Sequence, residues 1–303
     1  MTRIATVFGA TGLQGGTVVR QLLKDGIFKP RAVTRDSHSD GARELAQLGA
    51  EVVEGDLSSY GSVKKAMVGA EVVFAVTFAP RGGKGNRENE QGKFIVDAAR
   101  ELGIKYLIWS SVTTIVGSSG GKYKALLLDD KAEVDGYLRA SGVPHSILLT
   151  GAFLENWTRK ELLDCATLND NGDVCFNSRW VPGTLAVLSW IERDMALSVS
   201  ALLRAYDNGR LSEISGKDYL MVCARLPIEG WHKIIETTLG KKVNVTWLPT
   251  VNFADLDNMY DSWKEFPWYM DKQVPDPGLV ALGVEFGTLE DFVRTEMKPR
   301  LGL

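Results

Sequence analysis

The chain has 303 residues, of which 45% are hydrophobic, enough for one large α/β unit with a smaller attached region or for two modest domains. Its formal charge is -3 at pH 7, and no block of Lys or Arg forms a stripe, which argues against a nucleic-acid partner. The three cysteines lack C-x-x-C spacing and no apolar run approaches the roughly 20 residues of a membrane span, so neither a metal site nor a membrane anchor is indicated.

The first apolar run, residues 4–8, is rich in β-branched side chains and predicts a buried strand. It begins too early to leave room for a signal peptide, so we expect a cytoplasmic protein. Gly9, Gly12, Gly15 and Gly16 follow, and then a helical pattern starts. A strand, a glycine turn and a helix in this order direct backbone N–H groups at one point, where a pyrophosphate fits. We therefore predict a dinucleotide site, with a purely structural glycine turn as the alternative.

Strands and helices then alternate along the first half of the chain. Strands are expected at residues 30–34, 51–54, 71–76, 106–109 and 146–149, with helices at 18–25, 45–48, 63–68, 88–102 and 126–141. This alternation predicts an α/β protein with a Rossmann-type, doubly wound parallel sheet and ligands at the carboxyl ends of its strands.

The pattern becomes less regular after about residue 155. Helices are expected at 193–206 and 229–239, and strands at 219–223 and 243–248, which indicates a smaller C-terminal α+β substrate region. We assign residues 1–155 to an NADP-binding Rossmann domain and residues 156–303 to a substrate or partner region, with some of its elements returning to the Rossmann sheet.

Thr34-Arg35-Asp36 follows the second strand, where an adenosine ribose is expected. A carboxylate there suits the 2′-hydroxyl of NAD, whereas a guanidinium suits the 2′-phosphate of NADP. Arg35 comes first after the strand and favours NADP, although Asp36 argues for the other cofactor. In the alternative, both side chains are simply solvated.

Three further pairs of residues follow strands. Asp56 and Leu57 are placed near the adenine, with helix capping as the alternative for the carboxylate; Thr77 and Phe78 flank the cofactor; and Ser110 and Ser111 end a strand. A serine hydroxyl there can reach a substrate carbonyl, or bond its own loop backbone. The glycine-rich stretches 79–87 and 116–122 also follow strands, and either closes over substrate or is an ordinary surface loop.

Lys131 lies on the helix after the fifth strand, where short-chain dehydrogenases place a Tyr-x-x-x-Lys pair. The position four residues earlier is Leu127, so the usual tyrosine acid is missing. Tyr123 lies eight residues before Lys131, about 12 Å along a helix, and cannot substitute for it in a continuous helix. A solvated lysine within a charged run is the alternative for Lys131.

The chain resembles the NmrA-like family, atypical short-chain dehydrogenases that are related to isoflavone reductases. The motifs that carry this resemblance are Gly9-Ala-Thr-Gly-Leu-Gln-Gly-Gly16, Val33-Thr-Arg35, Gly55-Asp56, Gln91-Gly-Lys93, Asp130-Lys131-Ala-Glu-Val and Phe153-Leu-Glu-Asn156. Segments near the C-terminus, at 239–248 and 282–292, also match, so the resemblance covers nearly the whole chain.

The resemblance implies a set of NADP(H) contacts. They are Gly9, Ala10, Thr11, Gly12, Leu13, Gln14, Arg35, Asp56, Thr77, Lys93, Lys131, Phe153, Leu154, Glu155 and Asn156. Leu57 and Phe78 join this set through their positions after strands, not through the resemblance. Some family members are NADPH-dependent reductases of quinones or phenolic compounds. Others are non-catalytic regulators that bind a transcription factor and sense the NADP/NADPH balance, for which a nuclear location is expected. Both branches lack the tyrosine, so Leu127 does not separate them.

Aromatic residues are dense between 247 and 270. Phe253, Leu256, Tyr260 and Trp263 have helical spacing, which is typical of a packed core face. The alternative is a pocket wall that, with Trp157 and Trp180, stacks on a flat aromatic substrate. The sequence thus favours an NADPH-dependent reductase of a small aromatic carbonyl, enone or quinone, with Lys131, Ser111 or a water as proton source. An epimerase or dehydratase is disfavoured by the missing tyrosine.

Overall fold

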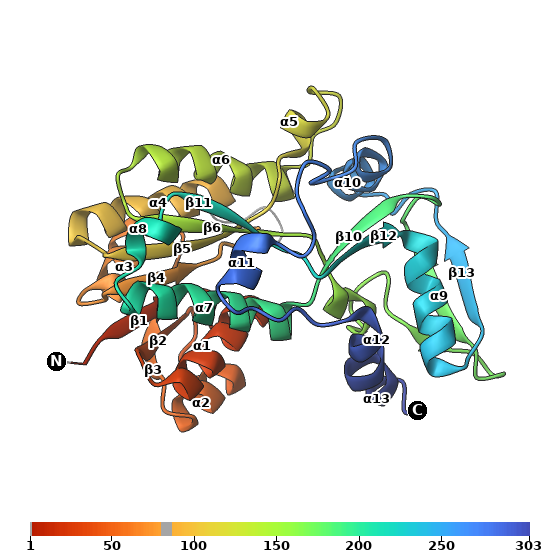
Figure 1. The fold of residues 1–303 in the computed structure, drawn as a ribbon, viewed down its shortest axis with the longest axis horizontal. Coiled ribbons are helices and arrows are strands. Elements are labelled where there is room, and N and C mark those ends of the chain that lie inside the picture. The colour runs from red at the N-terminus through yellow and green to blue at the C-terminus, as the bar shows by residue number, and fades with distance from the viewer. Residues whose placement is uncertain (1, 80–86) are drawn as a thin grey trace.

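The computed structural model describes residues 2–79 and 87–303, and within them seven parallel strands form the main sheet (Figure 1). The strand order is β11-β6-β5-β4-β1-β2-β3. These strands are β1 Ile4–Val7, β2 Lys29–Thr34, β3 Glu51–Glu54, β4 Val72–Ala75, β5 Tyr106–Ser111, β6 His145–Thr150 and β11 Lys217–Met221. The chain reverses its winding direction between β1 and β4, which leaves a crevice at their carboxyl ends. The predicted Rossmann-type fold is confirmed.

Helices cover both faces of this sheet (Figure 1). One face carries α1 Leu13–Asp25, α2 Asp40–Gln47 and α7 Ala196–Asp207, and the other carries α3 Tyr60–Met67, α4 Glu88–Leu102 and α6 Leu126–Ala140. Because both faces are covered, every residue of β4, β5 and β6 is buried. The long apolar runs that predicted these strands reflect this two-sided burial.

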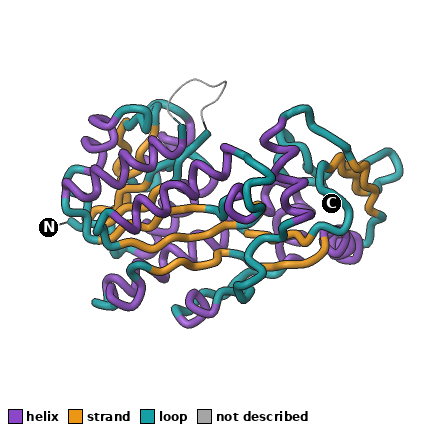
Figure 2. Tube along the Cα trace, turned by 90° about the horizontal axis from the view of Figure 1, so that it is seen from above, coloured by secondary structure: helices purple, strands orange, loops and turns teal. Residues whose placement is uncertain are grey.

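The C-terminal half forms two small sheets at the end of the molecule away from the N-terminus (Figure 2). One has the order β12-β10-β7, with β7 Ala152–Phe153, β10 Leu185–Ser189 and β12 Ala224–Pro227. The other has the order β13-β9-β8, with β8 Thr167–Leu168, β9 Val174–Ser178 and β13 Val243–Trp247. Helices α9 Ile228–Leu239, α10 Ala254–Glu265 and α12 Leu289–Phe292 pack around them, whereas α11 Pro277–Ala281 contacts β11 of the main sheet. The helices α5 Ile115–Ser118, α8 Leu211–Ile214 and α13 Lys298–Arg300 are short.

Several elements of this half differ from the sequence prediction. The helix expected at 193–206 begins as a π-helical turn, Ile191–Met195, and continues as α7. The strand expected at 219–223 is β11, which pairs in parallel with β6 and so extends the main sheet. The strands β7, β8, β9, β10 and β12 are absent from the prediction, and β7 and β8 have only two residues each, too short for a periodic pattern to reveal them.

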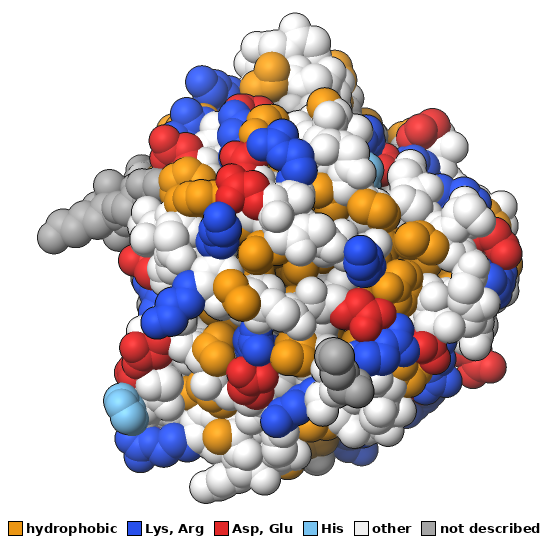
Figure 3. All heavy atoms as spheres, turned by 90° about the vertical axis from the view of Figure 1, so that its left-hand side faces the viewer, with side chains coloured by type: hydrophobic (Ala, Val, Ile, Leu, Met, Phe, Trp, Pro, Cys, Tyr) orange, Lys and Arg blue, Asp and Glu red, His pale blue; other side chains and the backbone are white. Residues whose placement is uncertain are grey.

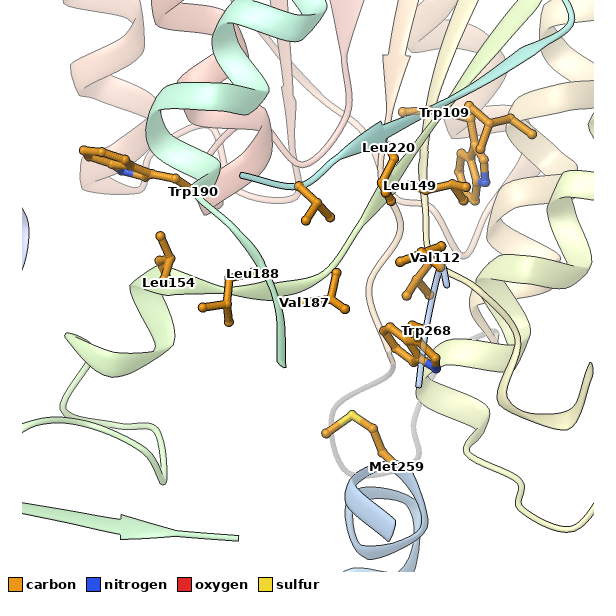
Figure 4. Packing of buried hydrophobic residues seen from close by; sticks show 14 of the residues in the cluster. Trp109, Val112, Leu149, Leu154, Val187, Leu188, Trp190, Leu220, Met259 and Trp268 are labelled. Atoms are coloured by element: carbon orange, nitrogen blue, oxygen red, sulfur yellow. The ribbon is translucent and has the colours of Figure 1, made fainter. Parts of the chain in front are cut away.

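A continuous apolar core joins the main sheet to the C-terminal half. Leu149 of β6 and Val112, just after β5, face Val187 of β10 and Trp268 (Figure 4). Met259 of α10 lies on the far side of Trp268 in the same view. The C-terminal half is therefore held against the carboxyl ends of the strands, where the sequence predicts the ligand.

The surface carries no concentrated charge on the face drawn in Figure 3. Lys and Arg are interspersed there with Asp and Glu among the described side chains. Within residues 2–79 and 87–303, no helix is long and apolar enough to cross a bilayer. No three His, Cys, Asp or Glu side chains of the same residues gather closely enough to hold a metal ion.

Candidate functional site

The glycine turn after β1 brings the start of α1 against the strand. Gly9 has φ 65°, and its carbonyl oxygen accepts from the N–H of Gly12 at 2.9 Å. A Cβ on Gly15 would lie 2.3 Å from that same oxygen, so only a glycine allows this approach. The first N–H groups of α1 have no partner within the helix, and the N-cap residue Gly12 has no side chain to cap them. The turn therefore fits a pyrophosphate.

Residues beside the turn complete this surface. Ala10 is buried, Thr11 is exposed, and Leu13 and Gln14 are half-buried. The Gln14 side chain accepts a hydrogen bond from Ser110 Oγ at 2.6 Å, which links α1 to the end of β5. Phe78 is 49% exposed, and its ring lies so close to Gly9 that a Cβ there would be 2.7 Å from it.

Arg35 and Asp36 take different roles after β2. The Arg35 side chain is exposed, and among the described residues it forms no ion pair. The Asp36 carboxylate accepts from the N–H of His38 at 2.8 Å and so stabilises its own turn. Arg35 is thus the free charge at this position, as the NADP prediction requires.

Asp56 likewise stabilises a turn. Its exposed carboxylate accepts from the N–H of Ser58 at 2.8 Å. The following helix, α3, is capped by Ser59, whose side chain accepts from the N–H of Ser62. The capping alternative for Asp56 is therefore wrong, because Ser59 holds the cap position. Leu57 is half-buried against the core.

Lys131 lies in a buried polar cluster at the end of β4. Its Nζ donates to the carbonyl oxygen of Thr77 at 2.9 Å and to Thr77 Oγ1 at 3.1 Å, and it is ion-paired with Glu88. The hydroxyl of Thr77 donates to Glu88 at 2.6 Å. The side chain of Glu88 is 4% exposed and that of Lys131 is 17% exposed. Lys131 is therefore a fixed charge within the fold, and the solvated alternative is wrong.

Leu127 occupies the position of the missing tyrosine, and Tyr123 is the nearest tyrosine before it. The two residues lie on different sides of the start of α6. Leu127 is in the first turn of α6 and lines a cavity beside the ends of β5 and β6. Tyr123 precedes α6, and its hydroxyl donates to Glu265 of α10 at 2.9 Å. Lys122 also pairs with Glu265 at 2.5 Å, so the 116–122 stretch is attached to α10. The other stretch, 79–87, lies mostly outside the described residues.

Three of the cofactor contacts implied by the family resemblance lie away from the polar cluster around Lys131. Lys93 pairs with Glu133 at 2.5 Å on the seam between α4 and α6. Leu154 is fully buried, and the Glu155 carboxylate accepts from the N–H of Glu192 at 2.7 Å. Phe153 and Asn156 of the same segment do line the cavity.

The cavity has a volume of about 340 Å³ and lies between the strand ends and the C-terminal half. Its walls are formed by Gln14, Ser110, Ser111, Val112, Leu127, Leu128, Lys131, Thr150, Gly151, Ala152, Phe153, Asn156, Trp157, Leu162, Leu163, Asp164, Trp180, Leu256, Met259, Tyr260, Trp263 and Trp268. Most of these side chains are apolar, and the polar ones include Lys131 and Ser111. Such a lining is typical of a small-molecule site.

The aromatic side chains in this wall pack on one another. The ring centroids of Trp180 and Trp263 are 4.7 Å apart, and Tyr260 lies 5.3 Å from Trp263. These residues belong to the core and line the cavity, so both interpretations of the aromatic segment apply to them. Phe253 is 55% exposed and is not part of the wall.

Three acidic residues near the cavity were missed from the sequence. Glu88 pairs with Lys131. Asp164 accepts from Ser178 Oγ at 2.7 Å and from the Tyr260 hydroxyl at 3.1 Å. Asp135 is buried behind Ser111. Asp135 lies one helical turn after Lys131, and this spacing was the only available signal. Burial raises the pKa of Asp164, although both hydrogen bonds lower it.

Burial raises the pKa of Glu155 from 4.5 to about 7, against the backbone hydrogen bond from Glu192, which lowers it. The folded state therefore holds a proton that the unfolded state releases, and Glu155 costs stability progressively as the pH rises from 4.5 to 7. Glu155→Gln is expected to increase the free energy of unfolding relative to wild type. This increase should be about 3 kcal/mol larger at pH 8 than at pH 4. Urea unfolding at both pH values measures this, and an equal difference at both would contradict it.

Comparison with known proteins places this architecture in a family. The model of the NmrA-like family matches residues 1–275. The chain belongs to the NmrA-like family. A curated family member, the NmrA-like family domain-containing oxidoreductase lnaB of Aspergillus flavus, is 34% identical over 168 residues, which are 53% of this chain and 50% of the relative. The chain thus matches about half the length of this relative.

Solved structures of NmrA-like fold agree over nearly the whole chain. NmrA, a negative transcriptional regulator solved with NADP, has a TM-score of 0.82 at 19% identity, covering 99% of this chain and 97% of that one. The Escherichia coli NADPH-dependent quinone oxidoreductase QOR2, solved with NADPH, has a TM-score of 0.69 at 19% identity, covering 96% and 98%. At these identities the similarity establishes the shared fold.

Proposed function

We propose that this NmrA-like protein is an NADP(H)-dependent reductase of a small aromatic carbonyl, enone or quinone. The observation that carries the proposal is the cavity, which joins Lys131 and Ser111 to an aromatic wall beside the glycine turn. The oxidoreductase name of the fungal relative and the quinone oxidoreductase among the structural neighbours support it.

The cofactor contacts that we propose follow the strand ends. Gly9 to Gln14 hold the pyrophosphate, Arg35 the 2′-phosphate, Asp56 and Leu57 the adenine, and Thr77, Phe78, Lys131, Phe153 and Asn156 the nicotinamide half. Lys93, Leu154 and Glu155 are the implied contacts with the least structural support, because their side chains are engaged elsewhere or buried.

NADPH, when bound, supplies a hydride to an electrophilic carbon of the substrate. The protein contributes position, a dry site and a proton. Trp180, Trp263 and Trp268 stack on a flat ring and exclude water. Lys131 is a fixed positive charge that stabilises negative charge developing on the substrate oxygen, and Ser111 donates a hydrogen bond to that oxygen.

A direct test mixes purified protein with NADPH and a panel of quinones and phenolic ketones, and follows NADPH absorbance. We expect consumption that depends on the substrate. Tight NADPH binding without turnover on any member would overturn the reductase proposal. The regulatory alternative then requires different affinities for NADP and NADPH, measured by calorimetry, and a recovered protein partner.

Arg35→Ala is expected to raise the Kd for NADPH by about 10-fold to 100-fold, because a hydrogen bond to a charged group contributes about 1.5–3 kcal/mol. The Kd for NADH should stay unchanged, since NADH lacks the 2′-phosphate. Asp36→Ala serves as the matched variant, and its expected effect on NADPH affinity is small because its carboxylate is bonded to its own turn. Equal losses for both cofactors in Arg35→Ala would contradict the assignment.

A further inference from the structure

A buried carboxyl lies directly behind the serine of the cavity wall. Asp135 is 7% exposed, and its Oδ1 accepts from the indole N–H of Trp109 at 2.9 Å. The Ser111 side chain interacts with the same carboxyl and lines the cavity, and its hydroxyl also donates to the carbonyl oxygen of Val112 at 3.5 Å. Trp109 and Ser111 are on β5 and Asp135 is on α6, so the contact joins two rigid elements.

No cation is paired with this carboxyl among the described residues. Arg139, on the next turn of α6, bonds both carboxylate oxygens of Asp218 on β11, at 2.8 and 2.7 Å. Asp218 opposes ionisation of Asp135, and the neutral hydroxyl of Tyr269 is the other titratable group facing it. Burial raises the pKa of Asp135 to about 7, although Ser111, Arg139 and Trp109 lower it. The carboxyl therefore keeps its proton at mildly acidic pH.

We propose that Asp135 is the proton reservoir for reduction in this cavity, and that Ser111 passes the proton to the substrate. This inference rests on the proposed function. Once the substrate carbon has accepted the hydride, the substrate oxygen carries the electron pair and takes the proton of Ser111 Oγ. The proton of the Asp135 carboxyl moves to Ser111 Oγ at the same time, which leaves an Asp135 carboxylate that water reprotonates after release.

The arrangement replaces the missing tyrosine acid. Lys131 is ion-paired with Glu88 and bonded twice to Thr77, so its three N–H groups are occupied. Ser111 alone is too weak an acid to release a proton at neutral pH, whereas a neutral carboxyl behind it makes the transfer favourable. Asp135 does not line the cavity itself, so it is a positioning residue that acts through Ser111.

The pH profile of kcat tests this relay. In the wild type, kcat should fall as the pH rises through about 7, because Asp135 loses its proton. Asp135→Asn and Ser111→Ala should each lower kcat about 100-fold at pH 6, with little change in KM, and should remove this falling limb. Asp194→Asn is the matched control, since Asp194 is also a buried carboxyl but accepts from the N–H of Gly287 and from Arg193 and does not interact with Ser111. This variant should retain the falling limb.

A second measurement does not depend on turnover. The indole N–H signal of Trp109, followed by ¹H–¹⁵N NMR on the full chain, should titrate with a midpoint near pH 7 in the wild type. It should not titrate in Asp135→Asn, which also assigns the signal. A midpoint below pH 5 overturns the inference.

The outcomes distinguish the two proposals. If Asp135→Asn turns over and its kcat still falls as the pH rises through about 7, the relay is overturned and the reductase proposal stands. Absence of NADPH oxidation with every substrate overturns the reductase proposal and the relay with it, because no oxygen then needs the proton.

Discussion

Lys131→Met is expected to lower kcat about 1,000-fold and to destabilise the fold by about 3 kcal/mol. The first effect follows because Lys131 is the positive charge of the cavity wall. The second follows because the substitution leaves the carboxylate of Glu88, with a 4% exposed side chain, without its cation. We take the lower end of the range for a broken buried pair because Lys131 keeps 17% of its side-chain exposure.

The double variant Lys131→Met/Glu88→Gln separates the two effects. It removes both charges, so the stability measured by urea unfolding should return to near the wild-type value. The rate should remain low, since the cavity still lacks its cation. A double variant that regains activity would show that Lys131 acts only by supporting the fold.

Gly15→Ala is expected to be the most damaging single substitution in the glycine turn. The added Cβ would lie 2.3 Å from the carbonyl oxygen and 2.5 Å from the carbonyl carbon of Gly9. Backbone atoms cannot rotate away, so α1 must move from β1, at a cost of about 3 kcal/mol. The Kd for NADPH should rise about tenfold or more, equivalent to about 1.4 kcal/mol, because the pyrophosphate site is formed by that approach.

Gly61→Ala is the control for this substitution. Gly61 lies in α3 and a Cβ there would meet nothing within 4 Å. The same change of residue should therefore stabilise the fold by about 1 kcal/mol and leave NADPH affinity unchanged. Thermal unfolding and calorimetry compare the two variants, and equal behaviour would contradict the close-approach argument.

The resemblance carried by the short motifs proved sufficient for the family. The family model covers residues 1–275, and the main sheet follows the predicted alternation from β1 to β6. Both were predictable because parallel strands buried on two faces give long apolar runs, and glycines mark where the chain must turn.

The sequence by itself therefore determined the glycine turn, the missing tyrosine at Leu127 and the position of Arg35 directly after the second strand. These depend on local order along the chain, where spacing and residue type carry the information. Only the tertiary structure decided that Glu88 pairs with Lys131, that Asp135 lies behind Ser111 and that Trp180 meets Trp263. Those contacts join residues 24 to 83 positions apart, and such pairs form through packing of whole elements, which no local pattern encodes.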